Sequence, residues 1–190
     1  MKSRLLRILA CPDCGADIRF LEPVDTPQER EIVVGTLQCL GCLRRLPIVD
    51  SVPRLFPRSE LERRMRKTRA GFGWEWERYP GSMTEEDRRI FLEETQISPG
   101  DWQGRLAFDA GCGMGRYTLA ALSLGAEVGA LDLSDALLRL APALETGAKL
   151  HLVQGDLLHP PIKPGVFDIR SRKMGARQVI TGTPSSLEAR

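Results

Sequence analysis

A glycine-rich turn between a short apolar strand and a helix constrains this sequence most strongly. The segment Leu106-Ala-Phe-Asp-Ala-Gly-Cys-Gly-Met-Gly-Arg116 ends an apolar run in an acid and then has a glycine at every second position. Such glycines let backbone amides approach a bound nucleoside closely, because no side chain stands in the way. Roughly 20 residues further on, Glu127-Val-Gly-Ala-Leu-Asp132 is a second apolar strand ending in an acid, which suits a ribose hydroxyl pair. The two segments together predict nucleoside binding at the carboxyl ends of two strands.

Four of the five cysteines form two Cys-x-x-Cys pairs, Cys11-Pro-Asp-Cys14 and Cys39-Leu-Gly-Cys42, with 24 residues between them. A gap of two residues lets one tight turn present two sulfurs to one ion, and zinc prefers four ligands in a tetrahedron. A strand-like segment at 31–38 would return the chain to the first pair. We therefore expect a structural zinc ribbon, in which four thiolates leave no open position for catalysis. A ribbon without metal and two redox pairs are the alternatives.

The fifth cysteine and the two histidines carry weaker signals. Cys112 lies inside the glycine turn, and we interpret it as a small packing residue, because Arg116 is its only evident cation. His151 is expected to be a partly buried surface residue on a strand. His159 precedes two prolines in a loop, where contact with a ligand is an open alternative. The sequence identifies no catalytic base.

Composition and charge limit the classes of function. A chain of 190 residues has room for one ordinary domain and a small one. Its net charge of +2 gives no electrostatic argument for nucleic-acid binding. No apolar run reaches the roughly 20 residues of a membrane span, and the apolar part of the N-terminus is too short for a signal peptide. We therefore expect a cytoplasmic protein without membrane contact, where reducing conditions favour metal-bound thiolates over disulfides.

A charged connector separates the ribbon from the glycine turn. Ser59-Glu-Leu-Glu62 has the pattern of a capping box that opens a helix through Arg69. We interpret the basic run 63–69 as a solvated helix face, with nucleic-acid contact as the alternative. The aromatic segment 71–79 would either cover the ligand pocket as a lid or pack on the main domain.

Strands and helices alternate in the rest of the chain. This alternation predicts a parallel sheet with helices on both faces and ligands at the carboxyl ends of its strands. The predicted helix at 134–144 contains Pro142, which is expected to mark or kink the end of that helix. The predicted helices span 85–95, 116–124 and 134–144, and the predicted strands span 105–109, 126–131, 149–153 and 166 onward.

Several motifs, in order and spacing, resemble those of class I S-adenosylmethionine-dependent methyltransferases, of the type 11-like kind. The N-terminal half is similar to small zinc-ribbon proteins that activate translation-linked methyltransferases. With its proline-rich exit and Phe72-Gly-Trp-Glu-Trp76, it resembles a bacterial subgroup that joins a ribbon to such a domain. The implied fold class is α/β, a Rossmann-like methyltransferase domain preceded by a small zinc-ribbon domain. The motifs are Asp109-Ala-Gly-Cys-Gly-Met-Gly115, Leu131-Asp-Leu-Ser134, Gly155-Asp-Leu157 and Phe167-Asp-Ile169.

This resemblance implies which residues would contact S-adenosylmethionine. Asp109 would lie near the amino group of the cofactor, and Asp132 would accept hydrogen bonds from its ribose hydroxyls. A positively charged sulfonium suits these acids, and the G-x-G-x-G turn differs from the G-x-G-x-x-G turn of dinucleotide folds. The remaining positions are Gly111, Gly113 and Gly115 along the methionine part, Leu133 against the adenine, Asp156 at the adenine amine, and Leu157 beside it.

The last residues depart from the family. After Ile169 the sequence turns basic and loses strand and helix periodicity. We expect a disordered, non-homologous tail, a sheet that stops at its fourth strand, and a chain truncated after Ile169, as in a frame-shifted reading of a longer gene. Cofactor-contacting positions would then be present and most of the acceptor site would not. The expected domains are a zinc ribbon at 1–57, a helical and aromatic connector at 58–100, an S-adenosylmethionine-binding domain at 101–169 and the tail at 170–190.

Two functions fit these observations. The first is an enzyme, or an inactive fragment of one, that transfers a methyl group from S-adenosylmethionine to an unidentified acceptor. The second is a non-catalytic zinc-ribbon protein that docks on a partner methyltransferase. In either case the unpaired edge of an incomplete sheet would offer a contact to a protein partner.

Overall fold

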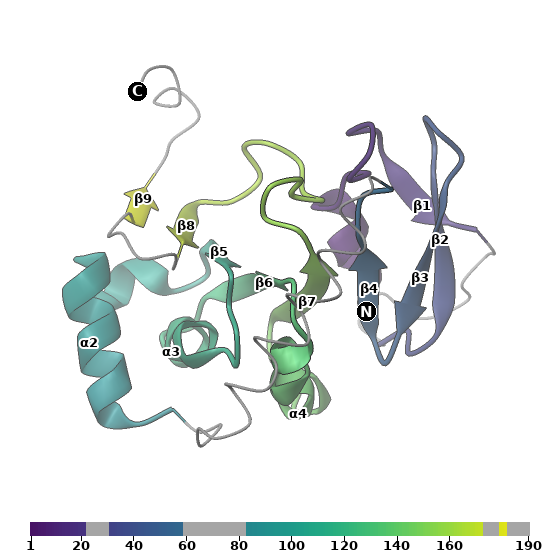
Figure 1. Ribbon diagram of the computed structural model, residues 1–190. Coiled ribbons are helices and arrows are strands. Elements are labelled where there is room, and N and C mark those ends of the chain that lie inside the picture. Colours follow the sequence, from purple (N-terminus) through teal and green to yellow (C-terminus); the bar gives the residue numbers. More distant parts are fainter. Residues whose placement is uncertain (22–30, 59–82, 173–178, 182–190) are drawn as a thin grey trace.

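A computed structural model describes residues 1–21, 31–58, 83–172 and 179–181. These residues form one nine-stranded sheet in the order β1-β2-β3-β4-β7-β6-β5-β8-β9 (Figure 1). The predicted helix at 59–69 and the aromatic segment at 71–79 lie outside the described residues. The expected α/β fold class, with a small ribbon ahead of a Rossmann-like sheet, is confirmed.

The N-terminal part of the sheet is antiparallel. Strands β3 and β4 form a tight hairpin in which Val49 pairs with Val52. Its two turn residues, Asp50 and Ser51, have φ values of 51° and 63°, the left-handed conformations of a type I′ turn. The strands of this part are β1 (Ile18–Phe20), β2 (Gly35–Cys39), β3 (Arg45–Val49) and β4 (Val52–Leu55).

The central part of the sheet is parallel, and β5 lies between β6 and β8. From β5 the chain moves outward to β6 and then to β7, and it returns to the other side of β5 to form β8. The direction of winding thus reverses at β5, which is where α/β folds of this kind bind ligands. These strands are β5 (Leu106–Ala110), β6 (Glu127–Asp132), β7 (Leu150–Gly155) and β8 (Ile169–Arg172).

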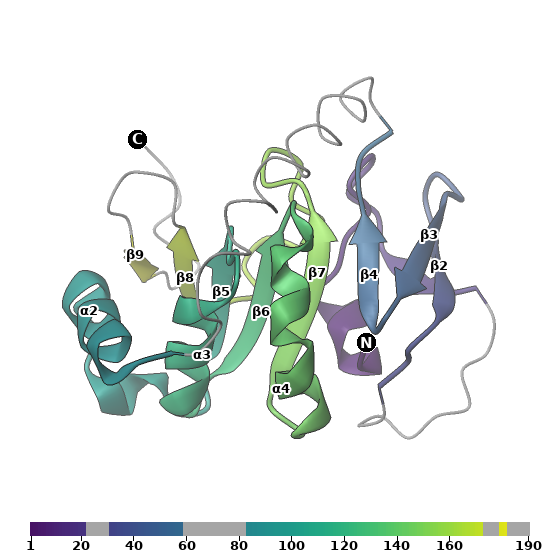
Figure 2. The ribbon, with the colours of Figure 1, turned by 60° about the horizontal axis from the view of Figure 1, so that its bottom comes forward.

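One strand pair joins the two parts of the sheet. Strand β4 lies parallel to β7, with Arg54 opposite Gln154 and Leu55 opposite Gly155. The last strand of the ribbon, β4, therefore adds one strand to the parallel sheet next to β7 (Figure 2).

Helices cover the two faces of the parallel strands differently. In Figure 2, α3 and α4 lie in front of β5, β6 and β7, and the 3-10 helix η1 lies behind β4 and β7. Two buried apolar clusters correspond to these faces: one joins the ribbon and η1 to Phe108 and Phe167, and the other joins α2, α3 and η3 to Val128 and Leu150. The helices are η1 (Ser3–Arg7), α2 (Glu85–Thr95), η2 (Pro99–Trp102), α3 (Arg116–Ser123), η3 (Asp135–Leu140) and α4 (Ala141–Glu145).

The structure corrects three details of the sequence analysis. Pro142 lies in the first turn of α4, after η3, because a residue without an amide proton is tolerated there. The fourth parallel strand begins at Ile169, three residues later than predicted. A further strand, β9 (Val179–Thr181), pairs antiparallel to β8 where the sequence predicts none, and its β-branched residues favour such pairing.

Membrane-spanning helices are absent from the described part of the chain. None of its helices combines the length and the apolar character that crossing a bilayer requires.

Candidate functional site

The two Cys-x-x-Cys pairs come together at one end of the ribbon. The Sγ atoms of Cys11, Cys14, Cys39 and Cys42 all lie within 4.8 Å of one another. Cys11 Sγ is 3.7 Å from Cys42 Sγ, and Cys14 Sγ is 3.4 Å from Cys39 Sγ. A tetrahedral zinc ion with bonds of about 2.3 Å needs sulfur atoms roughly 3.8 Å apart, so the residues fit this metal.

Backbone geometry at the second knuckle prepares Cys39 for metal binding. The amides of Gly41 and Cys42 each lie 3.3 Å from Cys39 Sγ and donate to it. Burial raises the pKa of the Cys39 thiol, but these amides and Cys14 outweigh burial and lower it, which favours the thiolate. A Cβ on Gly41 would lie 2.8 Å from the Cβ of Ala16, so only glycine lets the two knuckles approach.

The glycine turn after β5 is fastened to the end of β6. The amides of Gly111 and Cys112 donate to the carbonyl of Leu131, at 2.8 and 3.1 Å. The next amide in the turn, Gly113 N, donates to Asp132 Oδ2 at 2.8 Å. The turn and the second acidic strand end, which the sequence analysis paired by spacing alone, are therefore in direct contact.

Gly115 must be glycine for two reasons. It has a φ of +86°, and α3 begins directly after it. A Cβ at this position would lie 2.3 Å from Cδ2 of Leu140, a fully buried side chain of η3. The helix that follows β6 thus packs against the backbone of the turn.

Asp109 lies near the carboxyl end of β5 and is buried. Its Oδ2 accepts a hydrogen bond of 2.6 Å from the hydroxyl of Thr118 in α3, which fixes its orientation.

Cys112 packs against the apolar cluster beneath the helices. Burial, together with the charges of Asp109 and Asp132, raises the pKa of the Cys112 thiol well above its usual value. A protonated thiol is a packing residue and a poor nucleophile.

Asp132, the last residue of β6, also organises the loop that follows. Its Oδ1 accepts hydrogen bonds from the amide and the hydroxyl of Ser134, both at 2.7 Å. The Ser134 hydroxyl oxygen in turn accepts from the amide of Ala136 at the start of η3. One carboxylate thereby holds both the glycine turn and the loop on the other side of it.

Asp156 follows β7 directly and has its own local partners. Its Oδ1 accepts from the amide of Leu158 at 3.0 Å, and its Oδ2 lies 2.9 Å from Nδ1 of His159. His159 therefore contacts a predicted site residue, which the sequence analysis did not foresee. Leu157 packs against the apolar cluster on the η1 side of the sheet.

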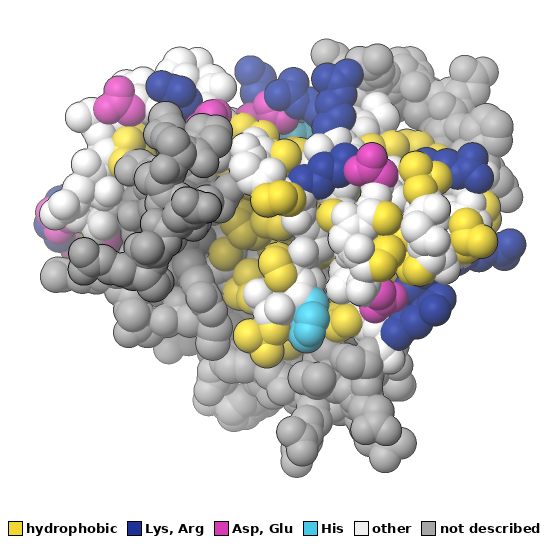
Figure 3. All heavy atoms as spheres, turned by 90° about the horizontal axis from the view of Figure 1, so that it is seen from above, with side chains coloured by type: hydrophobic (Ala, Val, Ile, Leu, Met, Phe, Trp, Pro, Cys, Tyr) yellow, Lys and Arg dark blue, Asp and Glu magenta, His cyan; other side chains and the backbone are white. Residues whose placement is uncertain are grey.

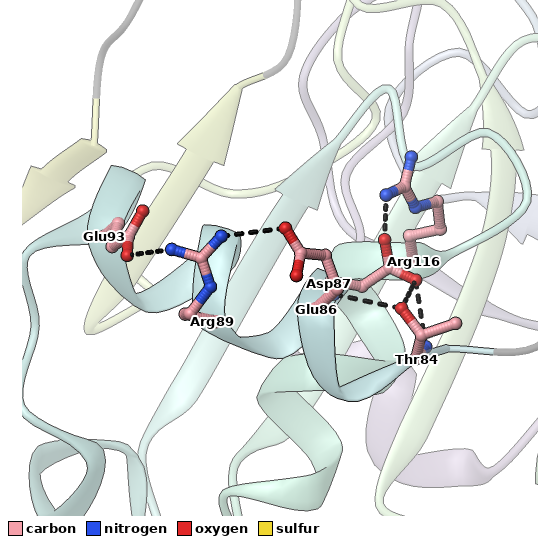
Figure 4. A network of polar contacts seen from close by, with 6 residues as sticks. All are labelled: Thr84, Glu86, Asp87, Arg89, Glu93 and Arg116. Carbon is pink, nitrogen blue, oxygen red and sulfur yellow. Dashed lines mark hydrogen bonds and ion pairs between the residues drawn. The ribbon is translucent and has the colours of Figure 1, made fainter.

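Arg116, the residue after Gly115, is occupied by an acid from another helix. Figure 4 shows its guanidinium directed at Asp87 of α2, with which it forms a close ion pair. Asp87 is buried and also closes the capping box of α2 with Thr84. This ion pair ties the start of α2 to the start of α3.

The sequence analysis missed a polar connection between the ribbon and the site. Arg54 of β4 donates from Nη1 to Oε1 of Gln154 in β7. The Nε2 of Gln154 donates to Oδ1 of Asp135 at 2.6 Å and to the carbonyl of Leu133 at 3.3 Å. No local pattern predicts this connection, because its two strands are 100 residues apart in the chain.

His151 differs from the expectation of a partly buried surface residue. It is only 3% exposed, and its Nε2 lies 2.7 Å from Oε1 of Glu127 on β6. Burial lowers the pKa of His151, against the opposing influence of Glu127. The residue lies inside because β7 is covered on both faces, which a strand-by-strand interpretation does not reveal.

The molecular surface mixes apolar and basic side chains on the face that Figure 3 shows. Among the described residues, several large apolar side chains are exposed, including those of Leu40, Leu43 and Leu158. Leu40 lies within the second Cys-x-x-Cys pair, Leu43 directly follows it, and Leu158 is two residues after Asp156.

The strand order and the zinc-type cluster define an α/β Rossmann-like domain joined to a zinc ribbon. Residues 107–173 match the family described as methyltransferase domain, and residues 2–51 match the family described as Trm112p-like protein. The chain is therefore similar to Trm112p-like proteins over its N-terminal segment and to methyltransferase domains over residues 107–173. No curated protein matches it.

Three solved structures are similar to this chain. Magnesium protoporphyrin IX methyltransferase from Synechocystis PCC 6803, with bound SAH, is 22% identical over 56% of this chain and 57% of its own, with a TM-score of 0.41. The YcgJ protein from Bacillus subtilis is 18% identical over 47% of this chain and 38% of its own, with a TM-score of 0.37. The 16S rRNA N2 G1207 methyltransferase of T. thermophilus, in complex with AdoMet and guanosine, is 17% identical over 83% of this chain and 40% of its own, with a TM-score of 0.38. This chain thus spans less than two thirds of each.

Proposed function

We propose that this chain binds S-adenosylmethionine and belongs to an enzyme that transfers its methyl group to an acceptor. One observation carries the proposal: Asp109, Asp132 and Asp156 stand at or directly after the carboxyl ends of the adjacent strands β5, β6 and β7, and Asp132 contacts the glycine turn through the amide of Gly113. Acidic side chains on this edge suit a cofactor with a positive sulfonium and several hydrogen-bond donors.

Each residue of the proposed site has a role that its chemistry supports. Asp132 would accept the ribose hydroxyls, with Leu133 against the adenine ring. Asp109 would face the amino group of the methionine part. The remaining contacts of the proposed site are Gly111, Gly113 and Gly115 along the methionine part, and Asp156 and Leu157 at the adenine.

The bound cofactor supplies a methyl group on a positively charged sulfur. The chain needs mainly to hold that cofactor in one orientation, since alignment of the acceptor with the methyl group supplies much of the acceleration. Thr118 contributes by fixing the carboxylate of Asp109, and Ser134 contributes by fixing that of Asp132. We assign no general base.

The four cysteines would hold a structural zinc ion. A closed set of four thiolates stabilises a small fold and leaves no position for substrate. We keep the predicted domain boundaries, with the ribbon ending at residue 57 and the cofactor domain spanning 101–169, as part of this proposal.

Calorimetry with S-adenosylhomocysteine tests the proposal directly. We expect saturable binding at one site per chain, and no binding of NAD at equal concentration, because the turn lacks the dinucleotide spacing. Absence of S-adenosylhomocysteine binding by the folded, zinc-loaded chain would contradict the proposed function.

A second candidate function is that of an activator that docks on a partner methyltransferase. The Trm112p-like match of residues 2–51 supports it. The pairing of β4 with β7 of the same chain favours the first function, because this edge of the ribbon already has an intramolecular partner. Size-exclusion chromatography distinguishes them: a chain that binds S-adenosylhomocysteine as a monomer supports the first.

A further inference from the structure

The side chain of Arg54 crosses from the ribbon into the loop region of the proposed cofactor site. Arg54 lies on β4, at the position opposite Gln154 on β7. Its side chain is only 15% exposed and donates to Gln154 Oε1. The same guanidinium lies 3.5 Å from Oδ1 of Asp135, the first residue of η3. Arg54 therefore contacts two elements that belong to the parallel sheet.

Gln154 relays this contact to the loop that follows β6. The residue is completely buried, and a buried amide must find partners for both its oxygen and its nitrogen. Arg54 satisfies the oxygen, while the carbonyl of Leu133 and the carboxylate of Asp135 satisfy the nitrogen. Without Arg54 the amide would keep a buried acceptor without this charged donor.

The loop 132–135 is consequently held from both ends. Asp132 fixes Ser134 through two hydrogen bonds, and Gln154 fixes the neighbouring carbonyl of Leu133. Leu133 is also the residue proposed to lie against the adenine. A loop restrained in this way needs less ordering when a ligand binds, which strengthens binding.

We propose that Arg54 is a positioning residue: acting through Gln154, it sets the conformation of the loop 132–135 and so the affinity of the site for the adenosine moiety. This inference rests on the proposed function for its ligand, but the effect on the loop is independent of it. The ribbon thereby contributes a side chain to the organisation of the site in the parallel sheet.

Hydrogen exchange of single amides, measured by NMR on the zinc-loaded chain, tests the effect on the loop without ligand. The variant is Arg54→Met, which keeps an unbranched side chain about as long as the aliphatic part of arginine and removes the guanidinium donors. We expect the amides of Ser134 and Ala136 to exchange about tenfold faster, while that of Ala130 inside β6 is unchanged. Arg45→Met on the exposed side of β3 is the matched control and should change none of them.

Calorimetry with S-adenosylhomocysteine on the same variants tests the effect on the ligand. We expect about tenfold weaker binding for Arg54→Met, or about 1.4 kcal/mol, with wild-type affinity for Arg45→Met. Arg54→Lys keeps one charged donor and should recover part of the affinity, and it replaces the methionine variant if that chain does not fold.

The outcomes separate the two proposals. Unchanged exchange of the Ser134 and Ala136 amides in Arg54→Met overturns the positioning role, whatever the affinity for S-adenosylhomocysteine. Faster exchange of the Ala130 amide as well also overturns the positioning role, because Arg54 would then stabilise the whole sheet and not the loop alone. Faster loop exchange in a protein that never binds S-adenosylhomocysteine supports the positioning of the loop and refutes the proposed function.

Discussion

The amide of Gly113 donates a hydrogen bond of 2.8 Å to Oδ2 of Asp132, and this contact joins the turn after β5 to the end of β6. The other carboxylate oxygen of Asp132 accepts from Ser134. A single acid thus fixes the two loops between which a nucleoside would lie. The relationship explains why the glycine turn and the second acid occur together in the sequence.

Replacing Asp132 with Asn should destabilise the protein even without ligand. Asparagine has one acceptor oxygen and cannot serve the donors on both sides, and losing a hydrogen bond to a charged group costs about 1.5–3 kcal/mol. Urea denaturation of the zinc-loaded chain measures the loss in free energy of unfolding. Asp101→Asn, on the exposed η2, is the matched control, and an equal loss in both variants would contradict the contact.

Gly115→Ala should lower the stability of the fold more than the same substitution at Gly147, where a Cβ would meet no other atom. Both Gly115 and Gly147 have positive φ, at 86° and 76°, but only the former has Leu140 where a Cβ would stand. We expect each alanine variant to lose about 1 kcal/mol to backbone strain, and Gly115→Ala to lose about 1–3 kcal/mol more to overpacking. Thermal denaturation gives the comparison, and equal melting temperatures would refute the packing of η3 on the turn.

The protein should contain a stoichiometric amount of zinc, and this zinc content should depend on the four clustered cysteines. We expect one zinc ion per chain by elemental analysis, retained in Cys112→Ser and lost or strongly reduced in Cys39→Ser. Removing the metal with a chelator should lower the free energy of unfolding by several kcal/mol, since structural zinc binding is coupled to folding. A chain that contains no zinc and melts at an unchanged temperature with chelator would contradict a structural site.

Stability should fall as the pH drops below the ordinary pKa of histidine, because of His151. Burial lowers its pKa in the folded state from 6.5, and its Nδ1 is buried with no hydrogen-bond partner among the residues that the structure describes. Below about pH 6.5 the unfolded chain therefore binds a proton that the folded chain does not, so stability is highest above this pH. The slope can reach about 1.4 kcal/mol per pH unit.

Urea denaturation between pH 7.5 and 5.5 checks this dependence. His151→Gln should flatten the decline, and His159→Gln should keep it, because that chain retains His151. A decline of the same size in His151→Gln would assign the pH dependence to other groups.

The sequence predicted the parts of the site that lie within short segments. The Cys-x-x-Cys spacing fixes the four sulfurs, and the alternation of apolar strands with helices fixes the parallel sheet, because both are set by residues close together in the chain. The glycine turn and Asp132 could be paired by spacing because a βαβ unit brings consecutive strands side by side.

Contacts between distant segments could not be predicted in this way. The pairing of β4 with β7 joins residues about a hundred positions apart, and neither the arginine nor the glutamine at that pair has a periodic signal. His151 seemed a surface residue for the same reason, since its partner Glu127 lies on another strand. Local pattern determines which elements form, and the order of the strands determines which polar side chains meet.

The central claim is that the acids at the ends of β5 and β6 bind S-adenosylmethionine, and the affinity of Asp109→Asn/Asp132→Asn for S-adenosylhomocysteine tests it most directly. Calorimetry is run at a temperature at which circular dichroism shows the variant to be folded, with Asp101→Asn as control. We expect at least a hundredfold loss of affinity in the double variant and wild-type affinity in the control. Equal affinity in the double variant and the wild type would contradict the assignment of this site.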